Sequence, residues 1–214
     1  YDIKRKKKLE NIIFEKIVEE KSLDYKNLKL EKFYSKNRLM VGAHSILPGS
    51  AYLDNYKGDL FIASPIGILG YGKIIDNKIE FKQIKNNIEN FININQFKKS
   101  NGFAVKDVKI FNDKIYISFS NEVEKNCWNT SVLFADINYT KLDFKKIFSP
   151  NECVHEYNNP DKVFVFHQAG GRIVGLDKNH ILLTQGEFRN RYLAQDKKSI
   201  FGKIIKININ AINK

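Results

Sequence analysis

The chain has little of what marks several common classes of protein. Its 214 residues contain no apolar run approaching the ~18–20 residues that a transmembrane helix needs. A phosphate-cradling P-loop, an HExxH zinc motif and a GxSxG hydrolase elbow are all missing from the sequence. These absences exclude the most easily recognised nucleotide-binding and hydrolytic classes.

Cysteine is also scarce. The two cysteines, Cys127 and Cys153, do not have the close spacing of a CxxC redox or zinc pair, and no histidine cluster accompanies them. A disulfide between them fits an exported protein, and two unrelated buried thiols are the alternative. No metal site is predicted from these side chains.

The formal net charge of +12 does not by itself indicate a nucleic-acid partner. Most of the 36 Lys and Arg residues are lysines scattered among Asn and Ile, without the basic and aromatic platform that binds bases. One dense run, residues 4–8, is typical of a solvated helix start or of the flank of a membrane segment. We expect no nucleic-acid binding, and a membrane tether upstream of Tyr1 stays an open alternative.

Apolar and aromatic residues are plentiful, with 43% hydrophobic residues that include 16 Phe and 10 Tyr, which is typical of a globular chain. Residues 1–38 are predicted to form an N-terminal amphipathic helix and a linker. The helix is predicted from apolar residues at helical spacing, namely Leu9, Ile12, Ile13, Ile17 and Val18. The Lys-rich stretch 25–38 is interpreted as a linker or an edge strand.

Residues 39–214 carry a different pattern, in which short runs of Ile, Val, Phe and Tyr alternate with turns containing Asn, Asp or Gly. Three similar blocks occur near 40–100, 101–160 and 161–214. The expected strands are 59–64, 70–75, 79–84, 108–111, 114–118, 131–137, 142–148, 172–174, 181–184 and 202–207. Repeated sheets that need neighbours to bury their faces predict an all-β fold of the β-propeller type, with about three blades present. A β-sandwich is the lesser alternative.

One cluster of chemically capable residues lies at the start of the third block. His167 precedes the paired glycines Gly170 and Gly171, which are followed by Arg172. Histidine side chains ordinarily titrate near neutrality and can act as general bases. Paired glycines allow a β-bulge or a close approach of the backbone. A structural histidine at the beginning of a strand is the alternative interpretation.

This cluster resembles a known motif. The run His167-Gln168-Ala169-Gly170-Gly171-Arg172-Ile173-Val174 is similar to the catalytic-histidine motif of soluble quinoprotein glucose and aldose-sugar dehydrogenases. Three later stretches also resemble that family, in order and nearly in spacing. They are Thr184-Gln185-Gly186-Glu187 with Arg189-Asn190, then Ala194-Gln195-Asp196 with Ser199, and then Gly202 to Ile207. Phe166 departs from the pattern, since the glucose enzyme has an Asp there.

The resemblance implies a six-bladed β-propeller that binds pyrroloquinoline quinone (PQQ) and calcium, of which this chain is a part. It implies that His167 takes the proton from a sugar hydroxyl while hydride passes to the quinone. The pocket residues that it implies are Gln168, Arg172, Arg189, Asn190 and Arg191, with the main binding residues for PQQ and calcium outside this segment. Arg191 replaces a substrate-contacting Gln of the family, and Arg172 also fits a structural role.

The same resemblance implies a sugar substrate and a periplasmic or extracellular location. Propellers host both enzymes and binding proteins, because the fold does not fix the function. A non-catalytic propeller that binds carbohydrate or protein is therefore the alternative function.

Overall fold

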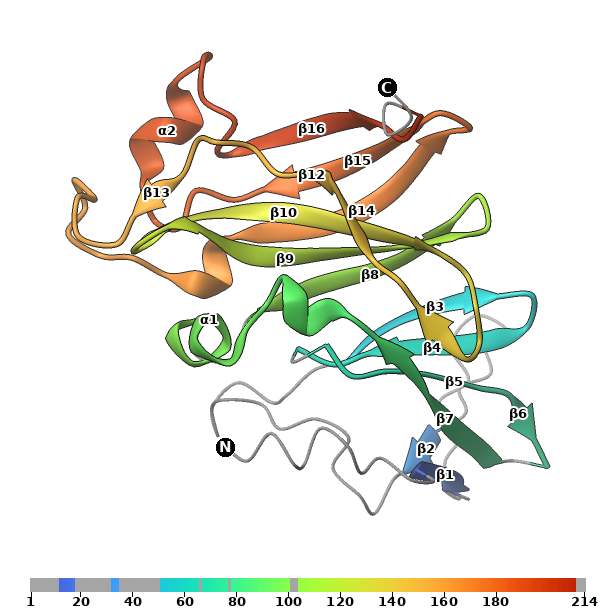
Figure 1. Cartoon of the computed structure of the whole chain (residues 1–214). Coiled ribbons are helices and arrows are strands. Elements are labelled where there is room, and N and C mark those ends of the chain that lie inside the picture. The colour runs from blue at the N-terminus through green and yellow to red at the C-terminus, as the bar shows by residue number, and fades with distance from the viewer. Residues whose placement is uncertain are drawn as a thin grey trace, which may run out of the picture.

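The computed structural model places most of the chain in β-sheets that succeed one another along the sequence (Figure 1). The residues that the structure describes are 12–17, 32–34, 51–65, 67–76, 78–100 and 104–210. The helices among them are η2 (Ile88–Asn90), α1 (Ile94–Lys99), η3 (Phe166–Gln168) and α2 (Arg191–Gln195). Within these residues, no helix has the length and apolar character needed to cross a bilayer.

The first sheet has the strand order β2-β1-β7-β5-β4-β3. Its strands are β1 (Ile12–Ile17), β2 (Lys32–Tyr34), β3 (Tyr52–Tyr56), β4 (Asp59–Ala63), β5 (Leu69–Gly72) and β7 (Lys78–Asn86). The short strands β6 (Ile74–Ile75) and β11 (Lys141–Leu142) also pair with β7. Lys57 and Gly58 close the β3–β4 hairpin, and both have the positive φ that such tight turns favour.

The second sheet has the order β12-β10-β9-β8, with β13 beside β10, and the third has the order β14-β15-β16. The strands of the second are β8 (Val105–Phe111), β9 (Lys114–Glu124), β10 (Cys127–Asp136), β12 (Lys145–Phe148) and β13 (Val154–His155). Those of the third are β14 (Gly170–Asp177), β15 (His180–Gln185) and β16 (Lys203–Asn208). Asn112 and Asp113, with φ of 50° and 56°, close the β8–β9 hairpin.

The second sheet is covered on both faces, because it lies between the other two. Ile115 and Ile117 of β9 belong to an apolar core shared with Phe61 of the first sheet. Tyr116, between them in sequence, belongs to a second core shared with Ile173 of the third sheet. Successive side chains of a strand point to opposite faces, so one strand supplies both cores. The sheets therefore pack face to face and are not joined edge to edge.

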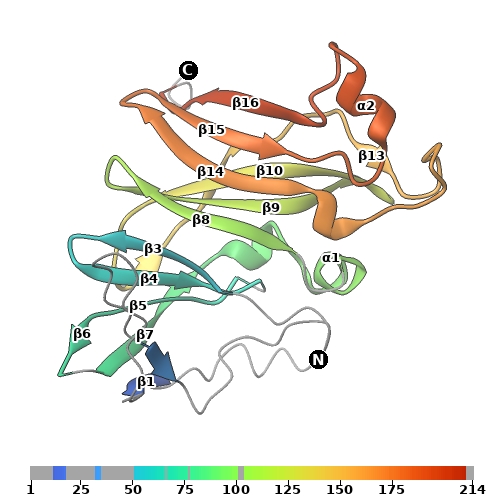
Figure 2. The same cartoon turned by 180° about the vertical axis from the view of Figure 1, so that it is seen from behind.

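One edge strand from each sheet, β3, β8 and β14, lies beside the next, and the three run in the same direction. β8 packs against β3 on one side and against β14 on the other (Figures 1 and 2). The ends at which β3, β8 and β14 begin therefore share one side of the molecule. The turn η3 leads into β14 at that side.

The predicted N-terminal helix is wrong over residues 12–17, which form strand β1. β1 pairs antiparallel with both β7 and β2, so its backbone is held across the sheet. Three of its six residues are isoleucine and one is phenylalanine, and β-branched and aromatic residues favour strands. Strand β2 lies at the edge of the sheet, which is one of the two interpretations of 25–38. Leu9 and Val18 lie outside the described residues.

Most of the strands expected from residue 59 onward are present, with shifts of a few residues at their ends. Some differences are larger. Strands β3 and β13 are not among the expected strands, the segment 70–75 is divided between β5 and β6, and the segment 142–148 is divided between β11 and β12. In β3 and in 142–148 the run of apolar residues is short and broken by Asn, Asp or Lys, which weakens the alternation that predicts a strand.

Candidate functional site

His167 lies in the turn η3, between the second and third sheets and directly before the bulged start of β14. Its side chain is exposed. The residue before it, Phe166, packs edge to face on Trp128 with ring centroids 4.7 Å apart, and Trp128 is fully buried. Phe164 completes this group at 4.8 Å from Phe166. The aromatic residue that replaces the family's Asp therefore anchors the turn that carries the histidine.

Lys106 of β8 reaches the same turn from the neighbouring sheet. Its side chain is buried, and its Nζ donates a hydrogen bond of 2.6 Å to the carbonyl oxygen of Phe166. Burial lowers the pKa of Lys106 to about 7, because removing the ammonium from water disfavours its charged form. Sequence reasoning misses this residue, since nothing local distinguishes it from the many exposed lysines.

The paired glycines after the turn produce a bulge in β14. Gly170 and Gly171 have φ of 71° and 111°, and the pairing with β15 shifts register between Gly170 and Ile173. The hydroxyl of Thr184 accepts hydrogen bonds from the backbone N–H groups of Gly171 and Arg172, at 3.2 and 2.9 Å. A Cβ at Gly171 would overlap the side chain of Lys106. Glycine is needed here for both its backbone conformation and the space that it leaves.

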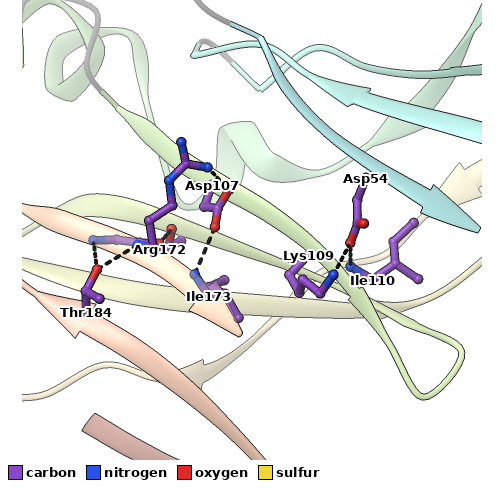
Figure 3. Close-up of polar contacts among 9 residues, drawn as sticks. Asp54, Asp107, Lys109, Ile110, Arg172, Ile173 and Thr184 are labelled. Atoms are coloured by element: carbon purple, nitrogen blue, oxygen red, sulfur yellow. Dashed lines mark hydrogen bonds and ion pairs between the residues drawn. The ribbon is translucent and has the colours of Figure 1, made fainter. Parts of the chain in front are cut away.

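Arg172 points toward Asp107 of the second sheet (Figure 3). Its Nη1 donates to Asp107 Oδ1 at 2.9 Å, and Asp107 Oδ2 accepts from the backbone N–H of Ile173 at 2.8 Å. The guanidinium also lies 5.7 Å from the ring centre of Tyr52 in β3. Burial raises the pKa of Asp107, while the Ile173 N–H and the charge of Arg172 oppose that rise. From β14, Arg172 thus contacts both β8 of the second sheet and β3 of the first.

The loop after β15 lies against the histidine turn. Gly186 N donates to Ala169 O at 2.8 Å, and Phe188 N donates to Gln168 O at 3.2 Å. A Cβ at Gly186 would overlap the carbonyl oxygen of Gln168, so only glycine allows this approach. The loop therefore brings the segment that contains Arg189 and Asn190 next to the His167 turn.

Two amide side chains in this region carry acceptors that the described residues leave without a hydrogen bond. They are Gln168 Oε1 and Asn190 Oδ1, and both atoms are buried. Buried polar atoms in native proteins nearly always have a partner, so these two are candidates for contact with a bound molecule. Arg189 is half-buried with a φ of 79°, whereas Arg191 is exposed on α2 and lies 3.7 Å from Asp161.

Of the residues predicted for the site, the structure thus groups His167 and Gln168 with the loop that contains Arg189 and Asn190. The guanidinium of Arg172 pairs with Asp107, and that of Arg191 lies 3.7 Å from Asp161.

Cys127 and Cys153 are joined by a disulfide that ties the start of β10 to the segment before β13. Their Cα atoms are 5.4 Å apart. Glu124 and these two sulfurs form the one group of three or more metal-ligating side chains among the described residues. Disulfide sulfurs do not supply thiolate ligands, so this group does not fit a metal ion.

Comparison with known proteins gives one family match and several structural ones. A family model described as glucose/sorbosone dehydrogenase matches residues 78–212, more than half of the chain. A solved structure of a glucose dehydrogenase is similar with a TM-score of 0.51 and 17% identity, covering 74% of this chain and 47% of its own. The apo-form of the soluble aldose sugar dehydrogenase from Escherichia coli is similar with a TM-score of 0.51 and 16% identity, covering 75% and 44%. No curated protein matches the chain.

The chain therefore spans about half the length of these solved structures. At this level of identity the likeness shows a shared fold over the matched part.

Proposed function

The chain belongs to the glucose/sorbosone dehydrogenase family, and on that premise we propose that it is part of a PQQ-dependent sugar or aldose dehydrogenase. The observation that carries the proposal is the placement of His167. Its side chain is exposed on a turn that two sheets hold in position, with one unsatisfied acceptor in the turn, Gln168 Oε1, and one in the adjoining loop, Asn190 Oδ1. That is the arrangement expected of a base that must meet a substrate from solvent.

We further propose that the three sheets are blades of a six-bladed propeller. The edge strands β3, β8 and β14 lie side by side in one direction, as the strands nearest a propeller axis do. His167 and the loop 186–190 then lie at the end of the blades where these strands begin. A ligand at that end would be central to the ring.

In the proposed reaction an imidazole nitrogen of His167 takes the proton from a substrate hydroxyl. Removing that proton makes the adjacent carbon a better hydride donor, and the quinone, when bound, accepts the hydride. The buried acceptors Gln168 Oε1 and Asn190 Oδ1 suit the other hydroxyl groups of a sugar, which are hydrogen-bond donors. This match in chemistry supports a polyol or aldose as the substrate class.

The residues fit the two expected cofactors unequally. Arg189, in the loop beside His167, offers a guanidinium for a carboxylate of PQQ. Calcium prefers a cage of several oxygen ligands, and the described residues hold no cluster of carboxylates that would form one. Calcium and most contacts to the quinone would therefore involve residues outside this part of the chain.

A non-catalytic propeller is the second candidate, and one observation favours it. The guanidinium of Arg172, within the histidine motif itself, is engaged by Asp107 and the Tyr52 ring. A motif that is kept for such structural contacts would remain in a protein that has lost its catalytic activity. In that case the same face would bind carbohydrate or protein without oxidising it.

The disulfide between Cys127 and Cys153 supports a periplasmic or extracellular location, because such bonds persist in oxidising compartments. We propose that location for the whole protein.

The test is a titration of the full-length gene product with PQQ, with and without calcium, followed by dye reduction with a panel of aldoses. We expect saturable binding of PQQ and sugar-dependent reduction. The variant His167→Gln should lower kcat at least about a hundredfold, because a positioned base contributes 10²–10⁴-fold. His180→Gln is the matched control, since His180 pairs with Asp177 at the opposite end of β14. Absence of PQQ binding would favour the non-catalytic propeller.

A further inference from the structure

We infer that Lys106 is a positioning residue for His167, and that its side-chain Nζ fixes the peptide between Phe166 and His167 from the neighbouring sheet. The inference concerns the orientation of a side chain whose catalytic role rests on the function proposed above. It adds a residue, on a different sheet, that the histidine motif does not contain.

The first support is the course of the Lys106 side chain. Lysine is almost never fully buried without a polar partner, yet Lys106 is only 7% exposed. Its Cβ and Cγ lie where a side chain at position 171 would be, and Gly171 leaves that space open. The missing side chain at Gly171 thus makes room for Lys106, and the buried position of Lys106 requires glycine at 171. Any larger residue at 171 would displace the lysine.

The second support is an irregularity in β8. Consecutive residues of a regular strand point to opposite faces, but the pairing of β8 with β9 shifts register between Val105 and Asp107. The shift is centred on Lys106. It allows Lys106 and Asp107 to reach the same neighbouring segment, one at Phe166 and the other at Ile173. A bulge in β8 therefore faces the bulge in β14.

The third support is what the hydrogen bond restrains. The acceptor is the carbonyl of Phe166, which is part of the rigid peptide plane that ends at the Cα of His167. The Phe166 ring is separately held against Trp128 and Phe164. With the ring and the carbonyl of Phe166 both fixed, the peptide before His167 and the position of its Cα have little freedom.

The test compares Lys106→Met with Lys203→Met in the full-length protein. Met preserves the length and packing of the side chain and removes the donor. Lys203 is the matched control because its ammonium also donates to backbone carbonyls, those of Leu193, Ala194 and Phe201, in a different loop. Amide hydrogen exchange is measured without added cofactor at Gln168 and Phe188, whose N–H groups are hydrogen-bonded at the turn.

We expect exchange at Gln168 and Phe188 to accelerate about tenfold in Lys106→Met, which corresponds to the loss of one hydrogen bond. The control should leave both rates unchanged. Lys106→Arg, which keeps a donor, should retain most of the protection. Wild-type protection in a folded Lys106→Met protein, or in Lys106→Leu as a second variant without a donor, would overturn the inference.

Kinetics separate this inference from the proposed function. If the wild-type protein oxidises sugars, Lys106→Met should lower kcat about tenfold and change KM less than about twofold, since a misdirected base affects the reaction more than binding. If the wild-type protein does not bind PQQ, the proposed function fails and the exchange experiment still decides the role of Lys106.

Discussion

The two junctions between neighbouring sheets are built on one plan and differ in one part. At the first junction, Asp54 of β3 accepts a hydrogen bond of 2.6 Å from the backbone N–H of Ile110 in β8. The same carboxylate forms an ion pair with Lys109 at 3.0 Å. A single acidic side chain thus holds the backbone and a cationic side chain of the next sheet (Figure 3).

At the second junction, Asp107 of β8 holds Ile173 and Arg172 of β14 in the same way. In both sheets the cationic residue directly precedes the isoleucine. The second junction adds the bulge at Gly170 and Gly171 and the contacts around it. The carboxylate found at both junctions therefore holds neighbouring sheets together. The bulge and its contacts, which are found only at the second junction, hold the turn that carries the histidine.

The sharpest way to break the second junction alone is Gly171→Ala. The new methyl would overlap Lys106 and strain a backbone with φ of 111°, so we expect a loss of about 3 kcal/mol in the free energy of unfolding. Gly58→Ala is the control, because φ is also positive there but nothing lies within 4 Å of its Cβ. It should cost about 1 kcal/mol. Equal losses in urea denaturation would show that the close approach to Lys106 contributes nothing.

The second comparison is between the two corresponding carboxylates, one at each junction. Asp54→Asn and Asp107→Asn each remove an ion pair and weaken a hydrogen bond to a backbone N–H, and each should cost about 2 kcal/mol. Only Asp107→Asn should also accelerate amide exchange at Gln168, because Asp107 acts on the strand that follows the turn. A change at Gln168 of the same size in Asp54→Asn would mean that the junctions are not independent.

Of the strands that form the two junctions, β8 and β14 were predicted from the sequence and β3 was not, and the partners of these strands were not predicted. The strands follow from alternation of apolar residues, and the hairpin turn at Asn112 and Asp113 follows from residue types that tolerate positive φ. The family resemblance, found from the motif at His167, is confirmed by the family match. These signals lie in short stretches of the chain, so they can be recognised without knowing how the sheets pack.

The contacts between sheets join residues that are far apart in sequence. Asp54 meets Ile110 and Asp107 meets Ile173, at separations of 56 and 66 residues. No periodicity links such pairs, so sequence alone does not distinguish these carboxylates from exposed ones. The burial of Lys106 is not predicted for the same reason, because it depends on a neighbouring sheet that packs against it. Strand β1 shows the converse, because pairing with β7 overrides a helical spacing.

The smallest expected difference between the junctions is in the pH dependence of the free energy of unfolding. The pKa of Lys106 is lowered by burial to about 7, whereas lysine in an unfolded chain titrates near 10.5. Between these values the unfolded chain binds a proton that the folded protein has released, so the stability of the wild type rises with pH in this window. Below pH 7 both states are protonated and the contribution to the slope disappears.

Lys106→Met lacks this titration. The difference in unfolding free energy between wild type and Lys106→Met should therefore shift in favour of the wild type by about 1 kcal/mol per pH unit between pH 7.5 and 9.5. Urea denaturation at several pH values measures it. Parallel curves for the two proteins would mean that Lys106 keeps its proton throughout, and that the lysine at the second junction is solvated like a surface lysine. A rising difference would establish that Lys106 gives up its proton in the folded protein, and that above pH 7 its Nζ donates to the Phe166 carbonyl as a neutral amine.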